Sequence, residues 1–397
     1  MSIRLMNEPG VPAMYPEDLG ADPGRAGTGP AAAPDSTSMS SAAAPAAPYP
    51  RSATYPRPAS YPRSATYPRP ASEAEIRELA ALPLDELKAL ARKTADAVHG
   101  DRVLLRGLIE VTNHCAMDCL YCGIRWSNSG AVRYRLSHEE LAETIRAGRR
   151  AGFMTFVLQG GEDPALAGEG LLRLTETARA AAGPEAAITL SFGIRSRREY
   201  EELRAAGADR YLMRFETSDP ELHRYLRGGI SLKRRLKALE DVRAAGLQLG
   251  SGFMTGLPGE TDETLIQNVL LAQSLKMEMG GVGPFIPHPE TPLGGARGGD
   301  LERAIRATAL LRLAVPLCHI PATTAAGTIH PEGREQMLEA GANVLMPNIT
   351  PVLHKKHYLL YPGKICIDES GFQCVGCLSV RVMGRGLRLS WERGDAL

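Results

Sequence analysis

The sequence has almost no excess of charge of either sign: 46 basic and 45 acidic residues give a formal net charge of +1. Such a balance provides no global field that would attract nucleic acid or an anionic membrane. The sequence also lacks an uninterrupted apolar run of membrane-spanning length, and its N-terminal segment lacks the apolar core of a secretory signal. We therefore expect a soluble, cytoplasmic protein without a nucleic-acid or membrane partner.

Cysteine is scarce, with seven residues in 397. In a long intracellular chain, cysteines are more often metal ligands or catalytic groups than disulfide partners. Six of the seven fall into two tight clusters, and Cys318 stands alone. The two clusters are therefore the first places to look for chemistry.

Residues 1–72 lack the apolar periodicity of a folded segment and are dominated by Ala, Pro, Ser and Gly. The run YPRSATYPRPAS occurs twice in succession, at 49–60 and 61–72. Frequent proline blocks helix and ladder hydrogen bonds, so this segment is predicted to be a disordered tail. Its arginines and tyrosines could bind an acidic partner or RNA, but an expanded repeat without a selected task is the simpler interpretation.

The remaining chain shows the alternating pattern of an α/β protein. Residues 73–100 indicate two amphipathic helices broken near Pro83, and 101–365 alternate apolar runs with charged helical segments. About eight strands predict a (β/α)8 barrel of the TIM type, with a doubly wound open sheet as the alternative. Residues 366–397 form a C-terminal segment that contains cysteines. The predicted strands are 103–111, 154–159, 187–192, 209–215, 247–254, 281–286, 317–322 and 342–347.

The first cysteine cluster directly follows the first predicted strand. Its spacing, Cys-x3-Cys-x2-Cys, uses Cys115, Cys119 and Cys122. Three thiolates can hold three corners of a [4Fe–4S] cluster and leave one iron open for S-adenosylmethionine (SAM). Tyr121 provides the aromatic residue before the last cysteine. A zinc site with His114 as the fourth ligand is the structural alternative, but this loop favours a radical SAM enzyme.

Other strand ends carry glycine, charged or hydroxyl residues. Gly160, Gly161 and Glu162 follow the second predicted strand, where bare backbone and a carboxylate could meet the ammonium of SAM. Alternation places Arg210, Arg214 and Glu216 on one face of a strand, where a salt-bridge network would be the structural alternative. Further candidates are Arg235 on the next predicted helix and the hydroxyl pair Thr323 and Thr324.

The second cysteine cluster lies beyond the last predicted strand, with the spacing Cys-x7-Cys-x2-Cys. Its members are Cys366, Cys374 and Cys377. These thiols could hold a second iron–sulfur cluster, of [2Fe–2S] or [4Fe–4S] type. A zinc site and metal-free thiols remain open alternatives.

Several segments together resemble the HydE family of [FeFe]-hydrogenase maturases, from about residue 75 to the C-terminus. They are TNHCAMDCLYCGIR, QGGEDP, ADRYLMRFET, GLPGET, GPFIPHPETPL, IPATTAAGT, GANVLMPN and YPGKIC. The tail has no counterpart in that family. The proline-rich run and the C-terminal cysteines are more specific for the family than the radical SAM loop.

The resemblance implies a complete barrel with a long internal cavity, and an Fe(CO)2(CN)(cysteine) synthon from the maturase HydG as substrate. HydF and a reduced ferredoxin or flavodoxin are further implied partners. The second cluster varies within the family and is considered dispensable there. The residues that match SAM contacts are Tyr121, Gly160, Glu162, Glu216, Arg235 and Met279, with Tyr358 nearby. The residues that match the cavity are Thr189, Arg210, Arg214, Thr323, Thr324 and Tyr361.

Two other functions compete with this interpretation. A related radical SAM mutase or sulfur-inserting enzyme, resembling methylornithine synthase or biotin synthase, would share the first cysteine loop. A non-catalytic iron–sulfur scaffold would hold a cluster without cleaving SAM.

Overall fold

The computed structural model describes residues 67–396. The tail predicted over 1–72 therefore lies mostly outside the described residues. Its last part is described: the Ala71 amide donates to Leu313 O at 3.0 Å, and the Ala71 carbonyl accepts from the Gln273 side chain at 2.7 Å. The packed chain thus begins slightly before Ser72. Within the described residues, no helix combines the length and apolar character needed to cross a membrane.

Nine strands and thirteen α-helices make up the described chain. The strands are β1 (Arg102–Leu105), β2 (Gly107–Thr112), β3 (Thr155–Gly160), β4 (Ala187–Ser191), β5 (Arg210–Leu212), β6 (Gln248–Thr255), β7 (Met279–Pro284), β8 (Val344–Leu345) and β9 (Arg388–Ser390). The helices are α1 (Glu73–Ala80), α2 (Leu84–His99), α3 (His138–Arg150), α4 (Glu169–Ala182), α5 (Arg197–Ala205), α6 (Pro220–Leu226), α7 (Leu232–Ala244), α8 (Asp262–Ser274), α9 (Leu301–Ala314), α10 (Thr324–Ile329), α11 (Gly333–Glu339), α12 (Val352–Lys355) and α13 (Gly371–Met383), with a short 3₁₀ turn at Pro164–Leu166.

The strands form a ring of eight positions. Strands β2 to β7 pair in parallel and in chain order, and β7 continues to the segment around His319 through an isolated bridge from Met279. That segment reaches β8 through Pro321, and the chain after β8 returns to β2 where Leu108 bonds to Pro347 and Ile349 at 3.0 and 2.8 Å. The predicted (β/α)8 barrel is confirmed, and the doubly wound sheet is not formed.

Local sequence explains where the helices begin and end. Ser137 caps α3 in a capping box with Glu140, and Ser196 caps α5 in the same way with Glu199. After these helices, Gly152 and Gly207 adopt φ values of 97° and 106°, which suit glycine. Both helices therefore stop where their strands must begin.

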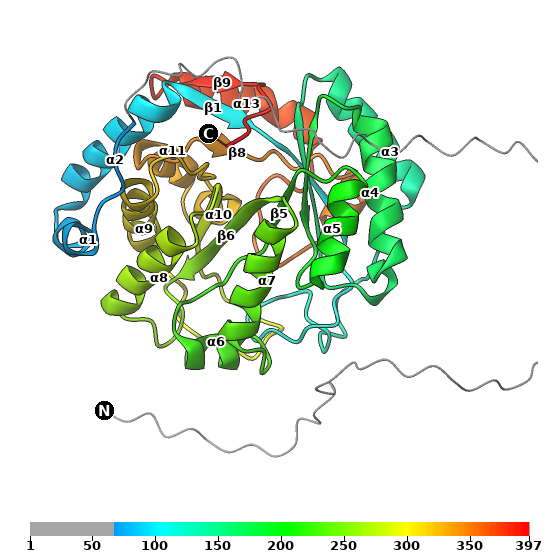
Figure 1. The fold of residues 1–397 in the computed structure, drawn as a ribbon, viewed down its shortest axis with the longest axis horizontal. Helices are drawn as coiled ribbons and strands as arrows, with labels where there is room; N and C mark the ends of the chain where they lie inside the picture. The colour runs from blue at the N-terminus through cyan, green and yellow to red at the C-terminus, as the bar shows by residue number, and fades with distance from the viewer. Residues whose placement is uncertain (1–66, 397) are drawn as a thin grey trace, which may run out of the picture. The chain divides into compact units, whose positions relative to one another are not determined.

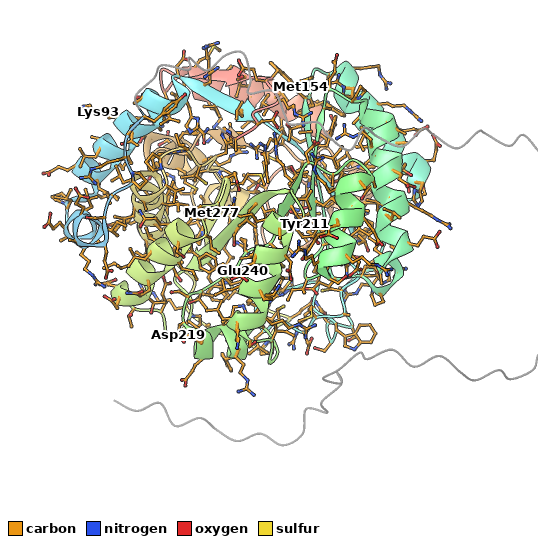
Figure 2. The ribbon with its side chains drawn as sticks, in the orientation of Figure 1. Lys93, Met154, Tyr211, Asp219, Glu240 and Met277 are labelled. Atoms are coloured by element: carbon orange, nitrogen blue, oxygen red, sulfur yellow. The ribbon has the colours of Figure 1, made fainter. Side chains whose placement is uncertain are left out.

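The helices cover the outside of the barrel. Figure 1 shows α3, α4 and α5 on one side of the strands and α8 and α9 on the other, while β1, β9 and the C-terminus lie at the end away from α6. Tyr211 on β5 packs edge-on against Tyr200 of α5, with ring centroids 4.8 Å apart. In Figure 2, Tyr211 lies inside the molecule and Asp219, before α6, lies at its periphery. The end near α6 is the end at which the strands finish.

Some predicted strands differ from those observed. The run predicted over 103–111 is divided at Arg106, because β1 pairs with β8 and β9 while β2 pairs with β3. The runs predicted over 317–322 and 342–347 contribute only isolated bridges and the two-residue β8. Strand β9 was not predicted.

Candidate active site

The loop after β2 carries Cys115, Cys119 and Cys122, and backbone hydrogen bonds fix it to distant parts of the chain. The Ala116 amide donates to Glu162 O at 2.9 Å, Leu120 to Leu226 O at 2.9 Å, and Gly123 to Leu360 O at 3.0 Å. The loop is thus held by the chain after β3, the end of α6 and the segment after α12. Its position therefore depends on several segments at the end of the barrel where the strands finish.

The three thiols lie in a sheltered environment. Cys119 is buried, whereas Cys115 and Cys122 are partly buried. Cys115 Sγ accepts hydrogen bonds from the amides of Met117 and Glu162, both at 3.4 Å. Burial raises the pKa of Cys115 to about 11 and also raises the pKa values of Cys119 and Cys122. Metal binding must therefore displace protons from these thiols.

The number of ligands bears on the choice between a cluster and the zinc alternative. A structural zinc site needs four protein ligands. In residues 67–396, the only group of three possible ligands with donor atoms within 4.8 Å is Cys366, Glu369 and Cys374, so His114 is not grouped with the thiols of the first loop. Three thiolates are the number that a [4Fe–4S] cluster with one open iron requires.

Glycines let a second loop approach the cysteines. A Cβ at Gly161 would lie 2.1 Å from His114 O and 2.6 Å from Cys115 Cβ. A Cβ at Gly160 would meet Thr112 and Phe192 side-chain atoms at 2.7 and 2.8 Å. A side chain would be too crowded at both positions, but only at Gly161 would it collide with the backbone beside the cysteine loop.

Two carboxylates at this end of the barrel are strained or incompletely paired. Glu216 is buried and has a φ of 67°, a backbone conformation that costs energy for a residue with a Cβ. Its Oε2 lies 3.2 Å from Arg214 Nη2 but has no well-aligned hydrogen bond. Glu162 is partly buried and contacts two arginines, Arg227 at 3.3 Å and Arg235 at 3.9 Å. Strain and poor pairing are typical of residues arranged for a ligand.

Arg235 on α7 is a buried cation with incomplete hydrogen bonding. The residue is 2% exposed, yet its Nε and Nη2 atoms have no hydrogen-bond partner among the described residues. Burial lowers the pKa of Arg235, and its contact with Glu162 Oε1, at 3.9 Å, is too long for a hydrogen bond. A carboxylate such as that of SAM would satisfy these nitrogen atoms, and the ammonium of SAM would suit Glu162 or Glu216. The residues present therefore fit a [4Fe–4S] cluster and SAM.

Arg227 belongs to this site and was missed by the sequence analysis. Its guanidinium donates to Tyr121 OH and to Glu162 Oε1, both at 3.3 Å. Gly228 and Gly229, with φ values of 62° and 93°, follow it directly. The motif Arg-Gly-Gly after a short helix was the available signal.

The segment after α12 brings two tyrosines toward the cysteines. Tyr358 is 3% exposed, and Lys364 Nζ lies 5.3 Å from its ring centroid. Lys364 also forms a buried ion pair with Glu110 of β2 and donates to Tyr358 O at 3.2 Å. Burial raises the pKa of Tyr361, whose hydroxyl bonds to Thr328. This ion pair anchors the segment to the barrel.

Other residues that were predicted to line the cavity are Thr189, Arg214, Thr323 and Thr324. Thr189 Oγ1 is buried without a partner in the described chain. A Cβ at Gly281 would make only ordinary contacts, the nearest with Arg214 Cδ at 3.7 Å, so the bare strand β7 leaves space beside Arg214. Thr323 caps α10, accepting from the Ala326 amide at 3.4 Å, and Thr324 is the first residue of that helix.

Arg210 and Met279 are each the first residue of a strand. Arg210 is fully buried at the start of β5, where Asp395 Oδ1 at 2.7 Å and the carbonyls of Arg393 and Gly394, each at 3.0 Å, surround its Nη2. Its expected role in binding a substrate beside Arg214 stays a prediction. Met279 begins β7 and lies in register with Gly250 of β6.

The second cysteine cluster is only partly assembled. Cys366 and Cys374 lie with Glu369, and Cys374 Sγ donates to Glu369 Oε1 at 2.9 Å. The contact with Cys374 lowers the pKa of Cys366. Cys377 is exposed, one turn further along α13. The expected three-cysteine set is thus two cysteines and a carboxylate in this structure.

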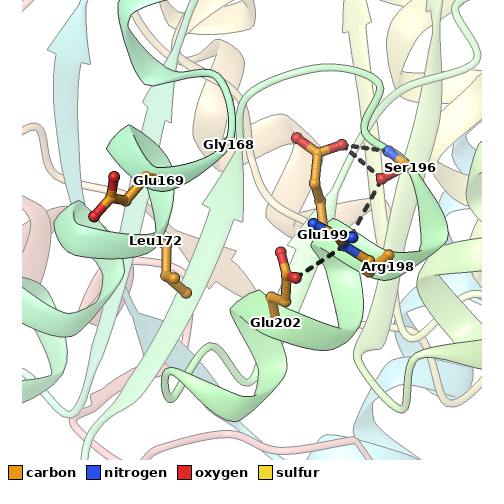
Figure 3. Close-up of a pocket in the computed structure, with 7 residues that line it drawn as sticks. All are labelled: Gly168, Glu169, Leu172, Ser196, Arg198, Glu199 and Glu202. Atoms are coloured by element: carbon orange, nitrogen blue, oxygen red, sulfur yellow. Dashed lines mark hydrogen bonds and ion pairs between the residues drawn. The ribbon is translucent and has the colours of Figure 1, made fainter. Parts of the chain in front are cut away.

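A surface pocket of about 570 Å³ between α4 and α5 is separate from this site. Figure 3 shows the Glu199 carboxylate bonded to Ser196 and the Glu202 carboxylate paired with Arg198. Glu169 pairs with Arg173 of its own helix. These acidic side chains of the pocket all have partners nearby, whereas Arg235 is buried with two nitrogen atoms that make no hydrogen bond.

Known proteins resemble this chain in sequence and fold. Residues 109–272 match the Radical SAM superfamily. The [FeFe] hydrogenase maturase subunit HydE of Thermotoga maritima is 42% identical over 75% of this chain and 87% of its own length. The 3-methylornithine synthase of Methanosarcina acetivorans is 31% identical over 69% of this chain and 78% of its own length. The crystal structure of methylornithine synthase PylB has a TM-score of 0.71 and 27% identity, covering 81% of this chain and 95% of that chain.

These comparisons agree with the barrel fold, and the cysteine loop lies within the residues that match the Radical SAM superfamily. The higher identity to the hydrogenase maturase, which extends over most of its length, distinguishes it from the methylornithine synthases. The chain is a radical SAM enzyme and belongs to the HydE family of [FeFe]-hydrogenase maturases.

Proposed function

We propose that this protein acts in assembly of the two-iron subcluster of the [FeFe]-hydrogenase active site. When bound, the cluster and SAM supply a 5′-deoxyadenosyl radical, which attacks a cysteine-bound Fe(CO)2(CN) synthon. The observation that carries this proposal is the buried guanidinium of Arg235, which lies beside Glu162 and the cysteine loop and whose Nε and Nη2 atoms make no hydrogen bond to the described residues. The 42% identity to a hydrogenase maturase supports a role in hydrogenase maturation over the other radical SAM functions considered.

The protein residues have separate tasks in this proposal. Cys115, Cys119 and Cys122 hold the first cluster, and Arg235 binds the carboxylate of SAM in a charge-assisted pair. Glu162 and Glu216 bind its ammonium or hydroxyl groups, while Tyr121 and Tyr358 border the site. Met279 remains a contact implied only by resemblance. Placement of the loop by three backbone bonds keeps these groups in fixed relation.

The substrate is proposed to enter the space next to Arg214. Arg214 has its guanidinium partly exposed, with 31% of its side chain accessible, so it can exchange its contact with Glu216 for a substrate carboxylate. Thr189 offers a buried hydroxyl without a partner in the described chain. Thr323, Thr324 and Tyr361 complete the proposed cavity wall.

Further parts of the proposal concern the second cluster and the partners. Cys366, Cys374 and Cys377 would hold a second iron–sulfur cluster, which requires Cys377 to turn toward the other two. HydG would supply the synthon, HydF would receive the product, and ferredoxin or flavodoxin would provide the electron, in the cytoplasm.

The function is tested by anaerobic reconstitution followed by reduction with dithionite in the presence of SAM. We expect the wild-type protein to release 5′-deoxyadenosine and to restore hydrogenase maturation in cells that lack their own HydE. Cys119→Ala should abolish both, because one thiolate of three is lost. Cys374→Ala, the matched control in the second cluster, should leave SAM cleavage largely intact.

The outcomes separate the competing functions. Turnover of lysine or dethiobiotin without support of maturation would replace this proposal with a mutase or sulfur-insertion activity, which the 31% identity to 3-methylornithine synthase makes the next candidate. A cluster that forms but never cleaves SAM would indicate a scaffold.

A further inference from the structure

Arg227 lies closer to the first cysteine loop than its place in the sequence suggests. It is the C-cap residue, directly after the last residue of α6, and it is 8% exposed. One end of its guanidinium contacts the hydroxyl of Tyr121, which lies between Cys119 and Cys122, and the other contacts Glu162, each at 3.3 Å. The charge is thus enclosed beside the loop and shielded from water.

The backbone around Arg227 prevents it from moving away. Leu226 O accepts a hydrogen bond from the Leu120 amide at 2.9 Å, which ties the end of α6 to the cysteine loop. Arg227 itself donates its amide to His223 O at 3.0 Å. Gly228 and Gly229 then turn the chain through positive φ values toward α7. The guanidinium is therefore a fixed cation and not a side chain that visits the loop.

Positive charge exceeds negative charge around Glu162. Glu162 contacts both Arg227 and Arg235, while the other carboxylate of the site, Glu216, pairs with Arg214, and the Nε atom of Arg227 has no partner among the described residues. Arg227 reaches the cysteine loop through Tyr121, the residue before Cys122. The excess lies where a cluster on this loop would carry its charge.

The physical consequence concerns the electron that the cluster must accept. A cluster becomes more negative by one charge when it is reduced, and nearby charges and hydrogen bonds set its potential. A buried cation stabilises an adjacent anion much more than an exposed one does, because water screens it less. An enclosed arginine in contact with Tyr121, between Cys119 and Cys122, would favour the reduced state.

We propose that Arg227 sets the reduction potential of the first cluster and makes its one-electron reduction easier. It acts through the cluster without bonding to it, and Glu162 opposes it by offsetting part of its charge. The inference depends on the proposed function only in assuming that an iron–sulfur cluster occupies Cys115, Cys119 and Cys122.

The test is a redox titration of the reconstituted full-length protein without SAM, followed by electron paramagnetic resonance of the reduced cluster. The second cluster is removed by a Cys374→Ala background so that one signal is followed. We expect Arg227→Gln to lower the equilibrium constant for reduction about tenfold, which for one electron is a shift of about 59 mV toward negative potential. Arg227→Lys should recover most of the shift because it retains the charge.

Two controls define the result. Arg224→Gln removes an exposed cation of the same helix and should leave the potential unchanged. Glu162→Gln removes the opposing charge and should shift the potential toward positive values. A wild-type potential in Arg227→Gln, with full iron content, would overturn the inference. If Arg227→Gln loads no cluster, an absent or negative shift in Glu162→Gln overturns it instead.

Failure of the inference differs from failure of the proposed function. If the wild-type cluster titrates normally but SAM is not cleaved, the functional proposal fails while the comparison of potentials still stands.

Discussion

At the residue scale, Gly161 is the most sensitive contact between the two loops of the site. A methyl group there would lie 2.1 Å from His114 O, so Gly161→Ala must push the glycine loop away from Cys115. Overpacking of this kind typically costs about 1–3 kcal/mol, and here the cost falls on the cysteine loop. We expect Gly161→Ala to incorporate less than half the wild-type iron after reconstitution, measured by iron and sulfide analysis.

The matched control for this substitution is Gly295→Ala. A Cβ at Gly295 has no atom within 4 Å, and its backbone has no positive φ. This variant should incorporate iron like the wild type. Equal loading of the two variants would show that the loops can separate without loss of the cluster.

At this scale, the sequence predicted which residues carry chemical groups better than it predicted how deep in the barrel each residue lies. The cysteine spacing and the glycines before Glu162 could be placed at strand ends from the sequence, because each motif directly follows an apolar run of strand length. Arg210 and Arg214 look equivalent by alternation, yet Arg210 is fully buried against Asp395, whereas Arg214 pairs with Glu216 and keeps 31% of its side chain exposed. No local pattern could show that residues 393–395 return to β5.

At the scale of elements, that C-terminal segment closes the lower end of the barrel. Arg210 has no exposed side-chain surface, and the side chain of its partner Asp395 is 11% exposed. Removing one member of a buried pair leaves a charge uncompensated, which typically costs about 3–5 kcal/mol. Because Arg210 would keep its carbonyl acceptors, we expect Asp395→Asn to lower the free energy of unfolding by about 3 kcal/mol, measured by urea denaturation.

An exposed pair provides the comparison for Asp395→Asn. Asp101 and Arg388 pair at 2.8 Å with side chains 51% and 63% exposed. Such surface pairs contribute about 0–1 kcal/mol, so Asp101→Asn should change stability much less. If both variants lose the same small amount, the segment is not a plug that stabilises the barrel.

The predicted elements were most accurate where strands alternate regularly with helices, from β3 to β7. Prediction was poorest where the ring closes. There β8 has two residues, and the segment around His319 joins by single bridges. Such short pairings have too little periodicity to be recognised, and their place is determined by closure of the barrel.

At the scale of the whole molecule, the site is assembled from segments that are far apart in the chain. The cysteine loop bonds to Glu162, Leu226 and Leu360, and Leu120 O accepts from the Leu293 amide at 3.2 Å. These bonds share a single loop, so anything that orders the loop should order its neighbours as well. Sequence similarity identified the family, but only the fold shows this coupling.

Cluster removal should therefore loosen regions that contain no cysteine of the first loop. Compared with the cluster-loaded protein, the cluster-free protein should exchange amide hydrogens faster in peptides that contain Glu162 and Leu293, because both amides donate to the cysteine loop. The peptide covering β9 lies at the opposite end of the barrel and should exchange equally in both forms. Hydrogen exchange followed by mass spectrometry measures all three. Faster exchange confined to residues 113–126 would show that the loop moves independently, and the site would then be a local motif and not a product of the closed barrel.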